Sequence, residues 1–259
     1  MLPSHAEPRI TIDDVTVGYG THPVQSGISA RIDRGEIFAI VGDSGSGKST
    51  LMKTMTGLIR AQSGRVLFDG KTVAECMQQG TPPFGILFQS GALWTSMTVL
   101  ENVMMPMDLQ NYSVPGARRE LARFKLALVG LAGDEHRYPA SLSGGMRKRA
   151  ALARALALDP SVLFLDEPSA GLDPLTSRRL DELVMTLRDG LGITVVLVTH
   201  ELESLHRIAD RMIFLDGETN RPVALGTPAE LARSADSPKV REFLTRRGSS
   251  PARHAEVAQ

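Results

Sequence analysis

One short segment constrains the fold of this chain more than any other. Residues Gly42 to Thr50 read G-D-S-G-S-G-K-S-T and follow directly on the apolar run 37–41. A buried strand, a glycine-rich turn and a helix start, in this order, form a loop whose main-chain N–H groups point at a phosphate. Lys48 would reach the β- and γ-phosphates, and Ser49 would offer its hydroxyl to Mg²⁺. The segment predicts a site for a nucleoside triphosphate with Mg²⁺, built from Gly42, Asp43, Ser44, Gly45, Ser46, Gly47, Lys48, Ser49 and Thr50.

Bulk composition limits the kinds of partner that this chain can have. Its 259 residues carry 29 basic and 29 acidic side chains, so the net charge is zero and a broad basic surface for nucleic acid is not expected. The only cysteine, Cys76, cannot form an internal disulfide, which favours a reducing compartment. No secretory signal opens the chain, and no apolar stretch approaches the roughly 20 residues of a membrane span. We therefore expect a protein that is soluble or attached to a membrane through another subunit.

Two patterns of apolar residues predict two kinds of strand. Continuous apolar runs suit a mainly parallel sheet covered by helices on both faces, and such runs occupy 36–41, 162–165 and 194–198. Apolar and polar residues alternate instead over 9–19. A further strand over 65–68 runs into the turn pair Asp69-Gly70 and then into 71–73, which indicates a hairpin. The expected fold class is α/β, with an N-terminal antiparallel β subdomain beside a mainly parallel core sheet.

Strand signals disappear between Ser90 and Leu158, where helical patterns replace them. Thr98 and Glu101 form a capping box before one apolar helical pattern, and further helical patterns cover 117–130 and 143–158. A later helix starts at Asp173-Pro174 and is expected to end at Gly190. We therefore predict one domain over 9–247 with an inserted helical subdomain over about 90–158, a flexible N-terminus over 1–8 and a disordered tail over 248–259.

Candidate catalytic residues follow the predicted strands of the core sheet. Asp166 and Glu167 come directly after the apolar run 162–165, at the edge where α/β sheets present their ligands. Asp166 suits a role in holding Mg²⁺, and Glu167 suits a general base that polarises the attacking water. His200 ends the next apolar run, where it could bridge the γ-phosphate and Glu167. Gln89 closes the strand-like segment 85–88, and its amide could touch both Mg²⁺ and the water.

A second helix start with the composition of an anion site lies far from the first. Ser143, Gly144 and Gly145 open the helical pattern 143–158, so their main-chain N–H groups point away from the helix. One nucleotide cannot easily use both helix starts within a single chain. A two-fold dimer, in which each chain completes the site of its partner, resolves this excess. The sequence therefore predicts a homodimer whose sites are shared in trans.

The order of these motifs resembles that of the ATP-binding cassette (ABC) ATPases over about residues 9–244. The resemblance implies that the nucleotide is ATP and that residues 42–50 form the phosphate loop. It implies that Gln89 is the Q-loop glutamine and that Leu142 to Met146 is the signature. It further implies that Tyr19 stacks on adenine and that Ser169 and Asp173 belong to the D-loop.

The same resemblance implies roles for the acidic residues and the histidine. Asp166 takes the metal-anchoring role, Glu167 the catalytic role and His200 the switch role. Together with Ser49 and Gln89, Asp166 would contact Mg²⁺. The implied activity is ATP hydrolysis coupled to transport.

A finer resemblance, to the ATPases of Mla-type phospholipid transporters, rests on the stretches 87–94, 143–150 and 238–244. Met146 stands where most cassette ATPases have glutamine, which leaves phosphate contact to Ser143 and the glycine amides. The resemblance implies multispanning membrane permease subunits, an Mce-domain lipid carrier and room for a small accessory subunit near the C-terminal segment. It also implies a peripheral location on the cytoplasmic face of the bacterial inner membrane.

Some features allow more than one interpretation. We interpret Arg147, Lys148 and Arg149 as a solvated helix face rather than as contacts to nucleic acid. The apolar residues between Met97 and Met107 could pack in the core or dock a cytoplasmic helix of a membrane subunit. The alternative functions are an ATPase for an importer of another small solute and a soluble ABC ATPase outside transport. Co-extraction with multispanning and Mce-domain subunits in mild detergent would separate these functions.

Overall fold

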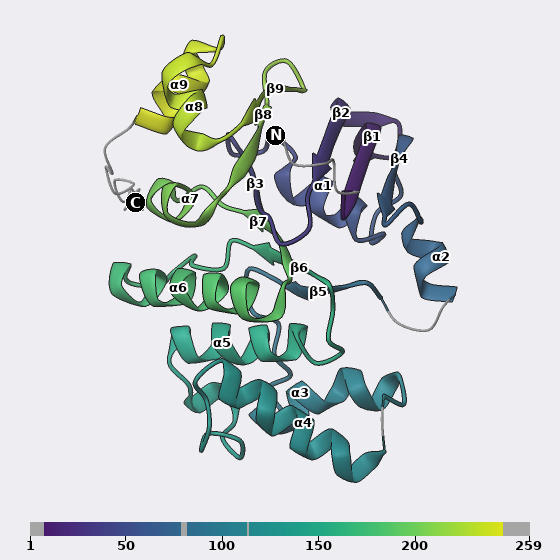
Figure 1. The fold of residues 1–259 in the computed structure, drawn as a ribbon, viewed down its shortest axis with the longest axis vertical. Coiled ribbons are helices and arrows are strands. Elements are labelled where there is room, and N and C mark those ends of the chain that lie inside the picture. The colour runs from purple at the N-terminus through teal and green to yellow at the C-terminus, as the bar shows by residue number, and fades with distance from the viewer. Residues whose placement is uncertain (1–7, 79–81, 113, 246–259) are drawn as a thin grey trace, which may run out of the picture.

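A mainly parallel sheet forms the centre of the molecule. The computed structural model describes residues 8–78, 82–112 and 114–245, so the predicted tail over 248–259 and all but one residue of the predicted N-terminal segment lie outside the described residues. The strand order is β5-β6-β7-β3-β8-β9, and only the pair β8 and β9 is antiparallel (Figure 1). The strands are β3 (Ile37–Gly42), β5 (Phe84–Leu87), β6 (Val162–Asp166), β7 (Thr194–Val198), β8 (Arg211–Asp216) and β9 (Arg221–Gly226).

A second, antiparallel sheet has the order β2-β1-β4. It consists of β1 (Ile10–Tyr19), β2 (His22–Ile32) and β4 (Ser63–Phe68). The two kinds of sheet confirm the predicted fold class, although β2 was not among the predicted strands. The predicted hairpin after β4 is wrong. Its turn exists, and Phe68 pairs with Lys71, but Glu75 caps the main-chain N–H of Thr72 and starts the helix α2 (Val73–Gln78) instead of a strand.

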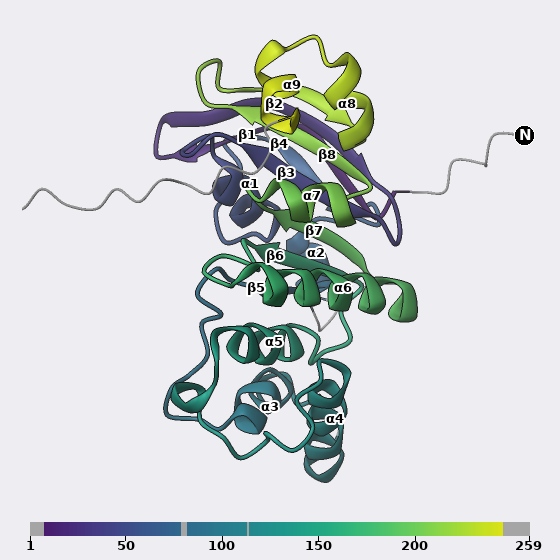
Figure 2. The same cartoon turned by 90° about the vertical axis from the view of Figure 1, so that its left-hand side faces the viewer.

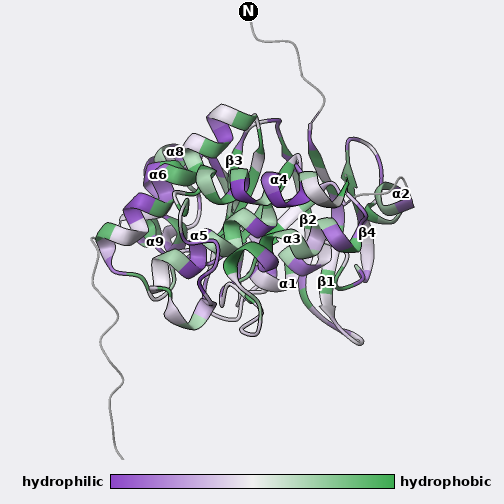
Figure 3. Cartoon of the chain, turned by 90° about the horizontal axis from the view of Figure 1, so that it is seen from below, coloured by the Kyte–Doolittle hydropathy of each residue, from purple (hydrophilic) through white to green (hydrophobic). Residues whose placement is uncertain are grey.

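Helices cover both faces of the central sheet because its strands are apolar on both sides. One face packs on α1 (Lys48–Met55) and the antiparallel sheet through residues such as Phe38, Phe164 and Val196. The opposite face packs on α6 (Pro174–Leu191) and its neighbours through Leu165 and Leu197. On that face lie also α7 (Leu202–Ile208), α8 (Pro228–Ser234) and α9 (Pro238–Thr245), which contact β3 and β8. Figure 3 shows the apolar residues gathered toward the middle of the molecule.

All regular elements described between β5 and β6 are helices. These are α3 (Val99–Leu109), α4 (Pro115–Leu128), the short 3-10 helix η1 (Pro139–Ser141) and α5 (Gly144–Ala155). Thr98 and Glu101 form the predicted capping box. Figures 1 and 2 show α3 and α4 at one end of the molecule and α8 and α9 at the other.

The apolar set between Met97 and Met107 belongs mostly to the core. Val99, Leu100, Val103 and Met107 are buried against α4 and α5, and Met104 packs on the same cluster. Core packing, rather than docking, is therefore the role of this set. Trp94, which lies just before this set, is 57 % exposed.

Helix α6 begins as predicted but ends later. Asp173 accepts a hydrogen bond from the main-chain N–H of Thr176 and caps the helix before Pro174. The expected end at Gly190 is wrong, because the helix continues to Leu191 and Gly192 caps it with a φ of 66°. Within the described parts of the chain, the helices are all too short or too polar to cross a bilayer.

Candidate functional site

The predicted site residues follow strands that end at one edge of the central sheet. Strand β3 leads into the loop 42–47, β5 into Gln89, β6 into Asp166 and Glu167, and β7 into His200. The parallel register pairs Asp166 with Val198 and Ile40 with Val198, so the strand ends lie next to one another. This edge is where an open α/β sheet presents its ligands.

Two glycines of the loop occupy positions that no other residue can take without rearrangement. Gly42 has a φ of 146°, and a Cβ there would lie 2.1 Å from the main-chain oxygen of Leu215. Gly47 has a φ of 89°, and its Cβ would lie 2.8 Å from Val24. The loop can therefore approach β2 and β8 closely and still present its main-chain N–H groups outward at the start of α1.

Lys48 lies folded against the loop that carries it. Its ammonium group donates to the main-chain oxygens of Gly42 and Asp43, at 2.9 and 2.6 Å, and the residue is only 9 % exposed. Burial lowers the pKa of Lys48, while Glu167, Asp43 and Asp166 act in the opposite direction. The ammonium group is held at the mouth of the loop by main-chain contacts that a phosphate could replace.

The donor set around Ser49 fits Mg²⁺. The hydroxyl of Ser49 lies 3.3 Å from Oδ1 of Asp166, which is nearly buried. Burial raises the pKa of Asp166, and the hydrogen bond from Ser49 opposes that shift. A hydroxyl and a carboxylate, completed by phosphate and water oxygens, form the kind of ligand set that Mg²⁺ takes. Among the described residues, no cluster of three or more His, Cys, Asp or Glu side chains could hold a metal by itself.

Both carboxylate oxygens of Glu167 have partners from other predicted site residues. Oε2 accepts a hydrogen bond from the amide of Gln89 at 2.7 Å, and Oε1 lies 3.1 Å from Nδ1 of His200. Glu167 has a φ of 45°, unusual for a residue other than glycine, and its main-chain N–H donates to Val198. The main chain thus turns sharply after β6 and directs this carboxylate between Gln89 and His200.

One cleft of about 610 Å³ brings most of these residues together. Its walls include Lys48, Ser49, Glu167 and His200, and Tyr19 lies at one side. Tyr19 is 55 % exposed, and its hydroxyl accepts a hydrogen bond from Thr50 at 3.4 Å. The cleft has the volume of a small-molecule site.

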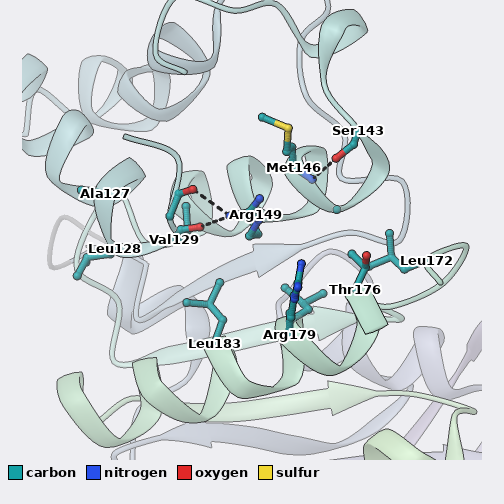
Figure 4. Close-up of a pocket in the computed structure, with 13 residues that line it drawn as sticks. Ala127, Leu128, Val129, Ser143, Met146, Arg149, Leu172, Thr176, Arg179 and Leu183 are labelled. Carbon is teal, nitrogen blue, oxygen red and sulfur yellow. Dashed lines mark hydrogen bonds between the residues drawn. The ribbon is translucent and has the colours of Figure 1, made fainter. Parts of the chain in front are cut away.

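The second helix start does not reach this cleft. Ser143, Gly145 and Met146 instead line a separate cavity of about 510 Å³ between α5, α6 and the end of α4 (Figure 4). Ser143 caps α5 by accepting the main-chain N–H of Met146, as the sequence predicts. The two predicted anion sites therefore lie apart within one chain.

The start of α6, which follows the predicted D-loop residues, packs on that second helix start. Ser169 is buried, and Asp173 accepts hydrogen bonds from both the N–H and the hydroxyl of Thr176. A Cβ on Gly145 would lie only 2.5 Å from the methyl group of Thr176. The start of α6 thus packs directly on the start of α5.

Lys148 is a residue whose importance the sequence reasoning missed. The interpretation of residues 147–149 as a solvated face holds only for Arg147, which is exposed. Lys148 is 7 % exposed and donates to the main-chain oxygens of Gln89 and Glu167. Arg149 is partly buried and donates to the oxygens of Val129 and Gly130 at the end of α4. Helical spacing was an available signal, because Lys148 shares a face with the apolar positions three, four and seven residues later.

Like Lys148, Arg154 joins α5 to the segment that follows β5. Its guanidinium donates to the main-chain oxygens of Gly91 and Ala92, at 2.8 and 2.6 Å. Helix α5 therefore holds the segment after β5 at three main-chain oxygens, those of Gln89, Gly91 and Ala92. Movement of α5 would be transmitted to the side chain that contacts Glu167.

Sequence comparison finds a family and named relatives. The family model described as ABC transporter matches residues 25–170. The probable ribonucleotide transport ATP-binding protein mkl of Mycobacterium tuberculosis is 36 % identical over 246 residues, which cover 93 % of this chain and 68 % of that protein. The methionine import ATP-binding protein MetN of Rhizobium johnstonii is 40 % identical over 215 residues, which cover 82 % of this chain and 59 % of that protein.

Structural comparison finds the same fold in solved proteins. The structure of cbiO1 from Clostridium perfringens, part of the ABC transporter complex cbiONQ, matches with a TM-score of 0.77 and 29 % identity, covering 87 % of this chain and 90 % of that one. The dimeric bacterial ABC transporter cassette MJ0796 matches with a TM-score of 0.74 and 29 % identity, covering 84 % of this chain and 98 % of that one. MJ0796 in a dimeric post-hydrolysis state bound to ADP and Pi also matches.

Proposed function

Since this chain belongs to the ABC transporter ATPase family and is an ATP-binding, ATP-hydrolysing subunit of that family, we propose that it powers phospholipid movement by a membrane complex. The observation that carries the catalytic part is the position of Glu167, between Gln89 and His200 in the cleft of the phosphate loop. The lipid cargo rests on the resemblance of the stretches 87–94, 143–150 and 238–244 to Mla-type ATPases.

In the proposed mechanism, the phosphate loop and Lys48 bind the β- and γ-phosphates. Lys48 would exchange its bonds to the carbonyls of Gly42 and Asp43 for bonds to phosphate oxygens. Ser49 and Asp166, with Gln89, would hold Mg²⁺, which neutralises developing charge on the phosphates. Tyr19 would stack on adenine beside Thr50.

Glu167 acts as the general base. It accepts a proton from the water that attacks the γ-phosphorus, while the phosphate chain leaves as ADP. Gln89 and His200 hold the two carboxylate oxygens, so the base does not have to be oriented at the moment of reaction. His200 is 58 % exposed at its side chain, where it can also reach the γ-phosphate.

The signature completes the site of a second copy. Ser143, Gly144 and Gly145 lie outside the cleft of their own chain, which suits contact with the nucleotide of the partner. ATP would close this dimer, and hydrolysis followed by phosphate release would reopen it. Ser169 and Asp173 would then lie near the dimer interface, because their neighbours Leu172 and Thr176 pack on Gly144 and Gly145.

The membrane subunits would dock beside Trp94 and hold the protein at the cytoplasmic face of the inner membrane. Asn102 is fully buried and fixes the loop below Trp94 with four hydrogen bonds, to the N–H and oxygen of Trp94 and to the oxygens of Met97 and Thr98. An exposed tryptophan on a rigid loop is a typical anchor for a partner helix. The same loop also carries Gln89. Docking of a partner beside Trp94 can therefore shift the position of Gln89 in the cleft.

A reconstituted complex tests the proposal. The chain would be purified with its membrane subunits, and phospholipid transfer between the membrane and an Mce-domain carrier would be followed with a fluorescent lipid. We expect transfer to require ATP and to stop in Glu167→Gln, whose side chain keeps the shape of the base but cannot take a proton. ATP hydrolysis without any lipid transfer would refute the cargo and leave the ATPase assignment intact.

Import of a small polar solute is the second candidate. The specific observation in its favour is that relatives are named for ribonucleotide transport and for methionine import. In the same complex, uptake of radiolabelled methionine or ribonucleotide into vesicles would be measured beside lipid transfer. ATP-dependent uptake of either solute without lipid transfer would replace the phospholipid proposal.

A further inference from the structure

The C-terminal helix α9 packs close to the phosphate loop, although nearly two hundred residues separate them in sequence. Val240 and Leu244 are buried in a cluster with β3 and β8, and Phe243 packs edge-on against Phe214, with ring centres 5.2 Å apart. His206 of α7 also lies 3.0 Å from the main-chain oxygen of Leu244. Apolar contacts therefore fix α9 on β8, independently of any charged residue at its start.

Lys239, in the first turn of α9, contacts a carboxylate of the phosphate loop. Its ammonium group lies 2.6 Å from Oδ2 of Asp43, 2.5 Å from Oδ1 of Asp216 and 3.2 Å from Oε1 of Glu218. Asp216 is nearly buried at its side chain, Asp43 is 42 % exposed and Glu218 is almost fully exposed. The lysine thus joins the phosphate loop to the turn between β8 and β9.

That turn supports the phosphate loop from behind. The main-chain oxygen of Leu215 lies so close to Gly42 that no side chain fits between them, and Gly217 packs against Ser46. Asp216 stands between these two contacts, and its second oxygen accepts both hydrogen bonds of Thr219. Lys239 therefore binds the phosphate loop through Asp43, and it binds the segment that packs on this loop through Asp216.

The negative charge of the Asp43 carboxylate opposes the binding of phosphate at this site. Its main-chain oxygen accepts a hydrogen bond from Lys48, so its carboxylate belongs to a residue in direct contact with the phosphate-binding lysine. A carboxylate beside a triphosphate repels it, and the repulsion is weakened only by solvent or by a neighbouring cation. Among the described residues, Lys239 forms an ion pair with Asp43, and the charge of Lys48 also interacts with that carboxylate.

We propose that Lys239 is a positioning residue for the phosphate loop: it offsets the charge of Asp43 and fixes the loop on the β8–β9 turn, so nucleotide affinity depends on the C-terminal helix. The proposal rests on residues 42–50 binding the phosphates. It adds a residue outside the recognised motifs to the nucleotide site. The stretch 238–244 thereby acquires a direct link to ATP binding.

A double-mutant cycle tests the proposal by nucleotide binding rather than by turnover. Lys239→Met keeps the length of the side chain and removes its charge. We expect this variant to bind a fluorescent ATP analogue about two- to fivefold more weakly at low ionic strength, a range typical of a partly exposed ion pair, and less so at high salt. The second variant, Lys239→Met with Asp43→Asn, removes the repelling carboxylate as well, and it is expected to recover the part of the affinity that was lost through charge.

Unfolding temperatures, compared with nucleotide affinities, distinguish a role of Lys239 in ATP binding from a purely structural role. Lys239→Met leaves the buried carboxylate of Asp216 without its ammonium partner, so both variants should unfold at a lower temperature. Asp43→Asn does not restore that loss, whereas it restores affinity. Arg241→Met serves as the matched control, because it removes a cation from the same helix whose recorded bond is to the oxygen of Ala235.

Each outcome has one meaning. Unchanged affinity in Lys239→Met, a loss equal to that of Arg241→Met, or failure of Asp43→Asn to restore affinity would overturn the inference. Lys48→Ala is measured beside these variants as a test of the underlying site. If Lys48→Ala bound the analogue as tightly as the native chain, the phosphate-loop assignment itself would fail. If only Lys48→Ala lost affinity, the assignment of the phosphate loop would be supported and the proposed role of Lys239 would be refuted.

Discussion

Lys148 places its ammonium nitrogen 3.2 Å from the main-chain oxygen of Glu167 and bonds the main-chain oxygen of Gln89 as well. Burial lowers the pKa of Lys148, while the carboxylates of Glu167, Asp166 and Glu201 favour its charged form. One cation of the signature helix therefore joins the two segments that hold the proposed base and its amide partner. The helix that begins at the signature therefore contacts the main chain of Glu167 in its own chain, although the signature itself is proposed to serve the nucleotide of the partner.

Replacing Lys148 by methionine should impair hydrolysis more than binding. The variant removes the Lys148 bond to the main-chain oxygen of Gln89, which costs about 1–3 kcal/mol of stability for a buried group, while the oxygen of Glu167 keeps the N–H of Ala170. We expect kcat to fall by about tenfold or more with little change in KM, because the base is misplaced and the phosphate loop is untouched. Lys148→Arg should recover part of the loss. Steady-state kinetics would decide, and a rise in KM with unchanged kcat would contradict the prediction.

Lys48→Ala and Glu167→Gln should fail in different ways. The lysine contributes charge to the bound ground state, so its loss should reduce ATP affinity by roughly tenfold or more. The glutamate acts on water, so Glu167→Gln should bind ATP normally, fail to turn it over and accumulate as a closed dimer. Equilibrium binding, phosphate release and gel filtration with ATP would separate the two. Near-native hydrolysis by Glu167→Gln would remove its assignment as the base.

Mixing two inactive variants should restore activity if sites are shared between chains. A heterodimer of Lys48→Ala with Ser143→Arg keeps one site intact and concentrates both lesions in the other. We expect activity to appear on mixing, up to about half of the native value if the sites act independently.

Disulfide formation checks the same arrangement without catalysis. With Cys76 replaced by serine, cysteines at Ser44 and Gly144 should cross-link between chains and more readily with ATP. Efficient cross-linking inside a monomer would rule out sites composed of two chains, since these residues line separate cavities or lie beside them.

Acid should abolish the contribution of Asp216 to stability. The hydrogen bond from Lys239 holds the pKa of Asp216 well below its usual value of about 3.9. Its ionised form therefore stabilises the fold above about pH 4, and the contribution is lost as the pH falls toward the lowered pKa. Urea unfolding of native and Asp216→Asn chains should differ at pH 6 and converge toward pH 2.5. The exposed Glu218→Gln serves as control, and a difference that grows in acid would contradict this assignment.

Trp94 and Leu100 should separate docking from core packing. Trp94→Ala removes an exposed ring, so the melting temperature should stay close to native while binding to the membrane subunits weakens. Leu100 is 3 % exposed, and Leu100→Asp places a charge in the core at a cost of several kcal/mol. Thermal unfolding of the isolated chain and pull-down with the membrane subunits would be measured together. Native binding by Trp94→Ala would exclude this ring from the docking surface.

Local motifs were predictable because they depend on residues adjacent in sequence. The loop 42–47, the caps at Thr98, Ser143 and Asp173 and the buried strands follow from short patterns. Parallel strand ends also meet at one edge, so the proximity of Glu167 to His200 could be anticipated before any distance was known. The assignment of the family follows from the order of these same motifs.

Errors arose where two signals competed or where the contact was long-range. At Thr72, a capping box and a turn signal overlapped, and the cap determined the structure. Gly190 offered an earlier helix end, but Gly192 is the residue that takes the left-handed conformation. Strand β2 was missed although Ile28, Ala30 and Ile32 alternate with the polar Ser29 and Arg31. The contacts of Lys148 and Lys239 reach carbonyls and carboxylates far away in the chain, which no local pattern records.

The contact between Gly145 and Thr176 restricts how the signature can change in evolution. A side chain at position 145 meets the methyl group of Thr176 at a distance that no real Cβ tolerates. Thr176 is itself bonded to Asp173, so it cannot simply move aside. Relatives that carry alanine at position 145 should therefore carry serine or a smaller residue at position 176. Substitutions in the signature and at the beginning of α6 are therefore expected to occur together among relatives, even though only the signature is proposed to touch the nucleotide.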